Sequence, residues 1–180
     1  MTLSVRTGTG KYDIICERGA LSRVGELLNL SRKVLIVTDD GVPAQYAESV
    51  AKACYEPHIV TLACGEGSKS IASFEMLCRT MLLHEFTRGD AVVAVGGGVV
   101  GDLAGFAASA YMRGVEFYNI PTTLLSQVES SIGGKTAVNL AGVKNAVGAF
   151  YQPLAVFCDV DLIQTMDDAF FADGVAESIK

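Results

Sequence analysis

The junction between residues 91–95 and the segment Gly96-Gly97-Gly98-Val99-Val100-Gly101-Asp102 constrains the fold more than any other part of this sequence. The apolar run Ala-Val-Val-Ala-Val is typical of a buried strand. Glycines at positions 96, 98 and 101 then fit the pattern G-x-G-x-x-G, in which the missing Cβ atoms let backbone N–H groups approach a pyrophosphate and let a helix pack closely on the strand. The pattern also occurs in plain turns. By itself it predicts a strand, a turn and a helix, and leaves the ligand open.

Strand-like and helix-like periodicity alternate along the rest of the chain. We expect strands at 12–16, 33–38, 58–62, 91–95, 116–120 and 155–158, and helices at 20–28, 43–54, 71–85, 103–110, 123–130 and 167–180. This alternation predicts a doubly wound, Rossmann-like α/β fold, with a parallel sheet covered on both faces. Ligands of such sheets bind at the carboxyl ends of the strands. We therefore expect the site in the loops at 38–40, 64–69, 96–102 and 121–123.

Length and composition exclude several classes of protein. With 180 residues the chain is about one domain. Lys and Arg number 14 against 20 Asp and Glu, and the net charge of −6 disfavours nucleic-acid binding. The five cysteines include no C-x-x-C pair, which predicts reduced thiols rather than a disulfide framework or a thiolate zinc site. No apolar run reaches about 18 residues and no signal-peptide pattern opens the chain, so we expect a cytoplasmic protein without a membrane partner.

Two familiar phosphate-binding motifs fit this sequence incompletely. Gly134-Lys135-Thr136 matches the end of a P-loop, but the first glycine of that motif falls on Glu129, whose carboxylate would repel phosphates. The Rossmann fingerprint requires a carboxylate at the end of the strand after the glycine turn, whereas Glu116 begins that strand. Asp39, at the end of an earlier strand, is the better candidate for a ribose-binding carboxylate. Its alternative role is that of a helix cap or turn residue.

Four cations lie in the predicted loops or at the ends of elements, although the chain is acidic overall. They are Lys69, Arg113, Lys135 and Lys144, each flanked by glycines or small polar residues. A single loop lysine is usually solvated surface. Four of them near the expected ligand edge favour an anionic substrate or cofactor.

Six motifs, in order and across essentially the whole chain, carry a resemblance to a known family. They are Gly96 to Phe106, Tyr111-Met112-Arg113-Gly114, Pro121-Thr122-Thr123-Leu124-Leu125, Ser130-Ser131-Ile132-Gly133-Gly134-Lys135-Thr136, Lys144-Asn145 with Gly148 to Pro153, and Ala176-Glu177-Ser178-Ile179-Lys180. Together they resemble the 3-dehydroquinate synthase family of sugar phosphate cyclases. The resemblance implies conversion of 3-deoxy-D-arabino-heptulosonate 7-phosphate to 3-dehydroquinate and phosphate in the shikimate pathway. It also implies bound NAD, which takes and returns a hydride, and a zinc ion as Lewis acid.

The resemblance also assigns roles to individual residues. It implies cofactor contacts from Asp39, Glu66, Lys69, Gly98, Val99, Val100, Gly101, Asp102, Thr122, Thr123, Lys144 and Thr165, catalytic or substrate contacts from Arg113, Glu129, Lys135, Asn145 and Lys180, and a metal ligand in Glu177. Arg113 resembles an arginine that reaches the substrate phosphate of a neighbouring subunit, which implies a homodimer.

The resemblance divides the chain into an NAD-binding α/β domain at 1–165 and, at 166–180, the first helix of a truncated helical domain that binds metal and substrate. The two histidines that complete the site for zinc or cobalt belong to that missing domain, and neither His58 nor His84 matches them. We therefore expect the isolated chain to bind NAD but to be inactive.

Three positions depart from the family pattern. Glu129 stands where Asp is usual, Cys64 where an acidic residue often opens the cofactor loop, and Val143 where Gly usually precedes Lys144, which could alter a turn. Three alternative functions stay open. These are another sugar phosphate cyclase, an iron-type polyol dehydrogenase that shares the glycine turn, and a non-catalytic module for nucleotide binding or dimerisation.

Overall fold

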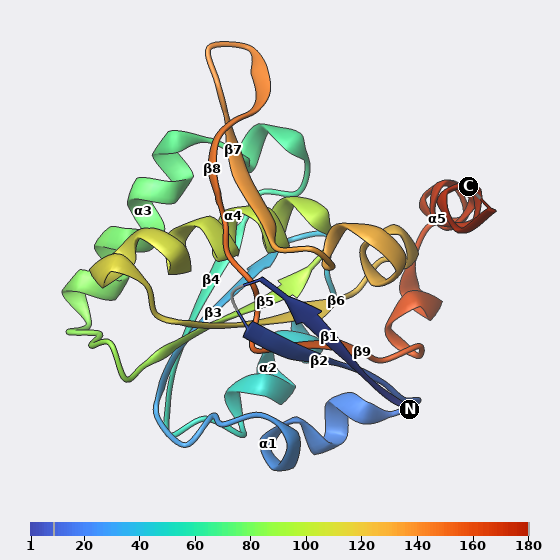
Figure 1. Cartoon of the computed structure of the whole chain (residues 1–180), viewed down its shortest axis with the longest axis horizontal. Coiled ribbons are helices and arrows are strands. Elements are labelled where there is room, and N and C mark those ends of the chain that lie inside the picture. The colour runs from blue at the N-terminus through green and yellow to red at the C-terminus, as the bar shows by residue number, and fades with distance from the viewer. Residues whose placement is uncertain (9, 180) are drawn as a thin grey trace.

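Seven strands form one twisted sheet with helices on both faces (Figure 1), in a computed structural model that describes residues 1–8 and 10–179. In spatial order the strands are β1 (Thr2–Thr7), β2 (Gly10–Cys16), β9 (Ala155–Cys158), β6 (Glu116–Pro121), β5 (Ala91–Gly96), β3 (Lys33–Asp39) and β4 (Glu56–Leu62). All neighbouring pairs are parallel except β1 with β2. The predicted doubly wound α/β fold is therefore confirmed, with an antiparallel edge strand, β1, that the sequence pattern did not predict.

Helices cover the two faces of this sheet because its central strands are apolar on both sides. The helical segments are η1 (Ala20–Arg23), α1 (Val24–Leu27), α2 (Ala44–Ala51), η2 (Glu66–Ser68), α3 (Ile71–Leu83), α4 (Gly98–Ala110), η3 (Tyr111–Arg113), η4 (Ser126–Ser130), η5 (Leu162–Thr165) and α5 (Asp168–Ile179). Along β3, Val34 and Ile36 pack on the side of α1 and α2, whereas Leu35 and Val37 pack on the side of α3 and α4. All four are fully buried. A continuous apolar run is what a strand covered on both faces requires.

The order of the strands creates a topological switch point between the carboxyl ends of β3 and β5, which we call the crevice. From β3 the chain runs outward to β4 and then returns to β5 on the other side of β3. At such a reversal the connections leave in opposite directions, and ligands of open α/β sheets bind there, beyond the carboxyl ends of the strands. Asp39 ends β3 and Gly96 ends β5. Two of the sequence-predicted ligand loops therefore flank this crevice.

A second, two-stranded sheet rises past α3 and α4 (Figure 1) and was not predicted from the sequence. Its strands β7 (Lys135–Leu140) and β8 (Val143–Phe150) pair antiparallel. Ala141 and Gly142 connect them with φ angles of 51° and 79°, as in a type I′ hairpin turn. Lys135 and Lys144, expected in loops or at the ends of elements, are the first residue of β7 and the second residue of β8. Val143 has no positive φ, so its replacement of the usual glycine does not alter the turn.

The helix predictions differ from the structure at several of their ends. Helix α4 begins at Gly98 rather than Leu103, because Gly97 is the N-cap and the glycine segment itself forms the first turn. The expected helix at 123–130 starts at residue 124 and becomes a π-helix at Ser126–Ser130, closed by a hydrogen bond from the N–H of Ser131 to the carbonyl of Ser126. Helix α2 ends at Ala51, before Cys54. In the described part of the chain, no helix has both the length and the apolar character needed to cross a membrane.

Candidate functional site

Asp39 lies at the carboxyl end of β3 and is nearly buried, with 9% of its surface exposed. Its Oδ1 accepts a hydrogen bond of 3.0 Å from the N–H of Gly41. Burial raises the pKa of this carboxyl above its ordinary value, and the neighbouring Asp40 acts in the same direction. A carboxylate held at the end of a central strand can accept hydrogen bonds from the hydroxyls of a ribose. The turn interaction with Gly41 shows that it also has the structural role considered above.

The amino-terminal end of α4 faces the same edge of the sheet. Gly97, its N-cap, is extended and provides no side-chain cap, and the N–H of Gly101 bonds to the carbonyl of Gly97 at 3.0 Å. The N–H groups of Gly98, Val99 and Val100 have no acceptor within the helix. They lie at the positive end of the helix dipole, where phosphate groups bind readily.

The glycines of this segment are required mainly by packing. A Cβ on Gly98 would lie 3.0 Å from Ser130 Oγ, and a Cβ on Gly101 would lie 3.0 Å from Asn119 Nδ2. The close packing of helix on strand expected from these glycines is therefore seen at Gly101, whose missing side chain makes room for Asn119 under the helix. In the described residues the buried Ser130 Oγ has no hydrogen-bond partner, which leaves a free hydroxyl beside Gly98.

Thr122 and Thr123, which follow β6, lie beside the glycine segment. The N–H of Thr122 donates to the carbonyl of Gly96 at 3.0 Å, and a Cβ on Gly97 would lie 3.3 Å from Cγ2 of Thr123. Thr165 lies in η5, where its hydroxyl is 3.2 Å from the hydroxyl of Tyr46. The structure thus brings the two adjacent threonines to the end of β5, whereas Thr165 packs against α2.

Lys69 is buried rather than solvated, with only 5% of its surface exposed. Its ammonium group forms an ion pair with Asp102 near the start of α4 and donates to Asn145 Oδ1 at 2.5 Å. Burial raises the pKa of the Asp102 carboxyl, although Lys69 acts in the opposite direction. Lys69 therefore connects the loop at 64–69 with helix α4 and with the β7–β8 hairpin. Its positive charge is already paired with Asp102.

A hollow of about 520 Å³ lies between the start of α4, the π-helix and the hairpin. Its lining includes four of the predicted site residues: Asp102, Glu129, Lys135 and Asn145. Lys135 Nζ lies 3.1 Å from Glu129 Oε1, and both side chains are largely exposed to solvent. The longer Glu129 side chain thus still contacts Lys135. This hollow can hold a small anionic molecule between a lysine, an amide and the end of α4.

Arg113 lies away from the other three cations. It follows the far end of α4, and the adjacent carbonyl of Met112 accepts a hydrogen bond of 3.2 Å from Arg88 Nε, just before β5. This position is at the amino ends of the strands, so the expectation that four cations share one ligand edge is wrong for Arg113. Met112 and Arg113 have positive φ angles of 52° and 67°, and Arg113 is exposed.

The described residues do not form a metal site around Glu177, which lies on α5. Within the described part of the chain, the side chains that could together hold a metal ion are Asp39, Asp40 and Cys64. They lie at the carboxyl ends of β3 and β4. The predicted zinc ligand therefore has no ligand set here that fits a catalytic zinc ion. Lys180, a predicted substrate contact, lies outside the described residues.

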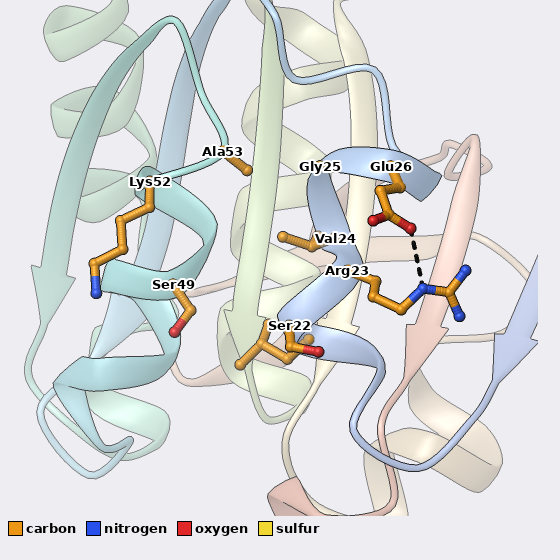
Figure 2. A pocket seen from close by; sticks show the side chains of 9 residues that line it. Ser22, Arg23, Val24, Gly25, Glu26, Ser49, Lys52 and Ala53 are labelled. Carbon is orange, nitrogen blue, oxygen red and sulfur yellow. Dashed lines mark hydrogen bonds and ion pairs between the residues drawn. The ribbon is translucent and has the colours of Figure 1, made fainter.

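A second hollow, of about 350 Å³, lies between α1 and α2, away from the predicted site (Figure 2). Figure 2 shows Arg23 paired with Glu26 at one side of the hollow. Ser49 on α2 and Lys52, which follows α2, lie at the other side. None of the sequence-predicted site residues lines it. We therefore assign the candidate functional site to the crevice and the hollow beside the hairpin.

Asn139 is a site residue that sequence reasoning missed. Its side chain bonds to Glu66 and to the backbone of Asn145, two residues of the predicted site. A single asparagine in a strand carries no recognisable pattern, and Glu66 is 73 positions away. Ser130 belongs to one of the six motifs, but the sequence did not predict a role for its side chain. Its importance depends on the close approach of Gly98, which sequence spacing does not reveal.

Comparisons with known proteins agree with this arrangement. Residues 59–173 match the model of the 3-dehydroquinate synthase N-terminal family. A 3-dehydroquinate synthase of Enterococcus faecalis is 43% identical over 187 residues, covering all of this chain and 52% of that protein. The chain spans about half the length of the curated relatives it matches.

Solved structures show the same fold. A 2-deoxy-scyllo-inosose synthase complexed with carbaglucose-6-phosphate, NAD⁺ and Co²⁺ superposes with a TM-score of 0.92 at 28% identity, covering 99% of this chain and 50% of that one. A 2-epi-5-epi-valiolone synthase from Streptomyces hygroscopicus, with NAD⁺ and Zn²⁺ bound, gives 0.85 at 29% identity, covering 97% and 50%. The fold is that of the sugar phosphate cyclases. Within that class, the chain belongs to the 3-dehydroquinate synthase N-terminal family.

Proposed function

We propose that this chain is the NAD-binding half of a 3-dehydroquinate synthase, which converts 3-deoxy-D-arabino-heptulosonate 7-phosphate to 3-dehydroquinate and phosphate. One observation carries the proposal. A buried carboxylate, Asp39, and a helix terminus with free N–H groups, Gly98 to Val100, lie on the two sides of the crevice between β3 and β5. A dinucleotide needs both features, one for a ribose and one for the pyrophosphate.

The residues present fit NAD. Asp39 would accept hydrogen bonds from the hydroxyls of the adenosine ribose, and the N–H groups of Gly98 to Val100 would bind the phosphates. The unpartnered hydroxyl of Ser130 is a further donor beside Gly98. Glu66, Thr122 and Thr123 would complete the contacts. When bound, NAD supplies a hydride acceptor that is regenerated in each turnover.

The hollow beside the hairpin is proposed to hold the sugar phosphate substrate. Lys135 and Asn145 would bind its anionic and hydroxyl groups, with Glu129 orienting Lys135 through their 3.1 Å contact. Lys144 would bridge cofactor and substrate. Because Arg113 lies at the opposite edge of the sheet, we place it at the substrate of a second copy of the chain, in a homodimer.

A divalent metal is part of this proposal, and the described residues supply its ligands only in part. Glu177 would supply one ligand, and the described residues around it do not complete a site. We therefore propose that residues 166–180 begin a second domain and that the 180-residue chain alone binds NAD without turnover.

The proposal is tested by binding and activity measurements on the chain. We expect the NAD-loaded chain to bind the heptulosonate 7-phosphate. We also expect the chain to release no inorganic phosphate when it is incubated with NAD and this sugar phosphate. Binding of a heptose 7-phosphate in preference to the heptulosonate would favour another sugar phosphate cyclase. NAD binding with neither sugar phosphate would favour a nucleotide-binding module, and phosphate release by the chain alone would contradict its inactivity.

A further inference from the structure

Lys144 and Asn145 lie in a bulge of the hairpin. Val138 pairs with Val147 and Leu140 pairs with Val143, so a single residue of β7, Asn139, faces three residues of β8, 144–146. Bulges remove residues from the regular ladder and re-aim their side chains, often next to active sites. Asn145 has a φ of 53°, in the left-handed region that is costly for most residues and less so for asparagine. The bulge therefore needs support from outside the ladder.

Asn139 supplies that support with three groups. Its Oδ1 accepts a hydrogen bond of 2.9 Å from the N–H of Asn145, and its Nδ2 donates to Glu66 Oε1 at 2.9 Å. Its own N–H donates to the carbonyl of Lys69 at 2.9 Å. Asn145 in turn accepts from the ammonium of Lys69. The cofactor loop and the bulge are thus joined through one side chain.

The contacts of Asn139 require an amide. The N–H of Asn145 can only donate and the carboxylate of Glu66 can only accept, so the residue between them must provide one acceptor and one donor. Aspartate has the same shape, but it keeps only the acceptor and would place a second carboxylate against Glu66. Alanine would remove both contacts.

We infer that Asn139 is a positioning residue that couples the cofactor loop at Glu66 to Asn145 at the substrate side. This inference rests on the proposed function, because Glu66 and Asn145 gain their roles from it. Asn139 is not expected to contact NAD or the sugar phosphate itself. It fixes the loop that receives NAD and the bulge that presents Asn145, so a change in one is transmitted to the other.

The test is a double-mutant cycle on NAD affinity, measured by calorimetry with the 180-residue chain. Asn139→Asp should weaken NAD binding about tenfold, since a hydrogen bond to a charged group is lost and repulsion is added. The Asn139→Asp/Glu66→Gln double variant should bind NAD better than the sum of the two single effects predicts, because the glutamine amide can donate to Asp at 139 and the repulsion is removed. Glu66→Gln alone completes the cycle. Asn29→Asp, which adds the same charge at an exposed position before β3, should leave NAD affinity unchanged.

A second readout follows the bulge without NAD. The backbone amide resonance of Asn145 should shift in Asn139→Ala, which lacks the acceptor, and stay near its original position in Asn139→Asp, which keeps it. Equal NAD affinity in Asn139→Asp and the unchanged chain, or strictly additive effects of Asn139→Asp and Glu66→Gln, would overturn the inference while leaving the proposed function intact. Absence of NAD binding by the unchanged chain would contradict the proposed function and the cofactor side of the inference together.

Discussion

At the scale of single residues, the pairing of Lys69 with Asp102 decides how the site should be probed. Lys69 is almost completely buried, and Asp102 provides the opposite charge. Removing one partner of a buried ion pair leaves an uncompensated charge in a poorly solvated position. Asp102 is therefore important for stability as well as for any contact with a cofactor.

We expect Asp102→Ala to lower the free energy of unfolding by about 3 kcal/mol, as for other buried pairs that lose one partner. Glu129→Ala is the matched control, because it removes an exposed ion pair with Lys135, and it should cost at most about 1 kcal/mol. Urea unfolding measures both. Equal and small losses of unfolding free energy in the two variants would show that the buried ammonium of Lys69 does not need its pairing with Asp102.

The sequence predicted which residue types gather at the site better than it predicted their surroundings. Asp39 lies at the expected edge of the fold because strand ends can be located from periodicity. Lys135 and Asn145 lie in a hairpin that periodicity did not reveal, and the family motifs pointed to them. Burial of Lys69 and the position of Arg113 could not be foreseen. Each depends on which segments pack together across long sequence separations, such as the 76 positions between Lys69 and Asn145.

At the scale of elements, the hairpin is the main feature that the sequence did not reveal. Strand β8 is largely exposed, so it lacks the alternation of apolar and polar residues that indicates a half-buried strand. The turn dipeptide Ala141-Gly142 is not one of the usual signals, because type I′ turns favour Asn-Gly or Asp-Gly. Packing of β7 against α4 holds the hairpin in place despite these weak local preferences.

The strained alanine in that turn gives a prediction for the element. Ala141 has a φ of 51°, where asparagine is tolerated better than alanine. Ala141→Asn should therefore raise the free energy of unfolding by about 0.5 to 1 kcal/mol, by relief of part of the left-handed penalty. Denaturant unfolding checks it, with Ala141→Ser as the control that changes polarity without the same backbone preference. A loss of stability in Ala141→Asn would contradict the type I′ assignment.

At the start of α4, in contrast, the sequence pattern predicted a helix correctly but placed its first residue too late. The glycine segment was expected to be a turn, since each glycine in a helix costs about 1 kcal/mol relative to alanine. Burial of Val100, Leu103 and Ala104 against the sheet and hairpin outweighs that cost. Tertiary packing thus extends the helix back to Gly98.

At the scale of the whole molecule, the alternation of strands and helices was enough to predict the sheet and to point to the edge where the candidate site lies. The order of the strands was not predictable from periodicity, and it is the order that places Asp39 and Gly96 on the two sides of one crevice. Helix α5 packs on the π-helix through Gly174, whose missing Cβ admits Leu124, and leaves Phe170, Phe171 and Ile179 exposed.

Calorimetric titration of the 180-residue chain with NAD tests the central claim most directly. We expect saturable binding of one NAD per chain, strongly weakened in Asp39→Ala and unchanged in Asn29→Asp, because the ribose carboxylate lies across the crevice from the glycine helix. Heat of binding that is absent, or that persists unchanged in Asp39→Ala, would contradict the assignment of the crevice between β3 and β5 as the cofactor site.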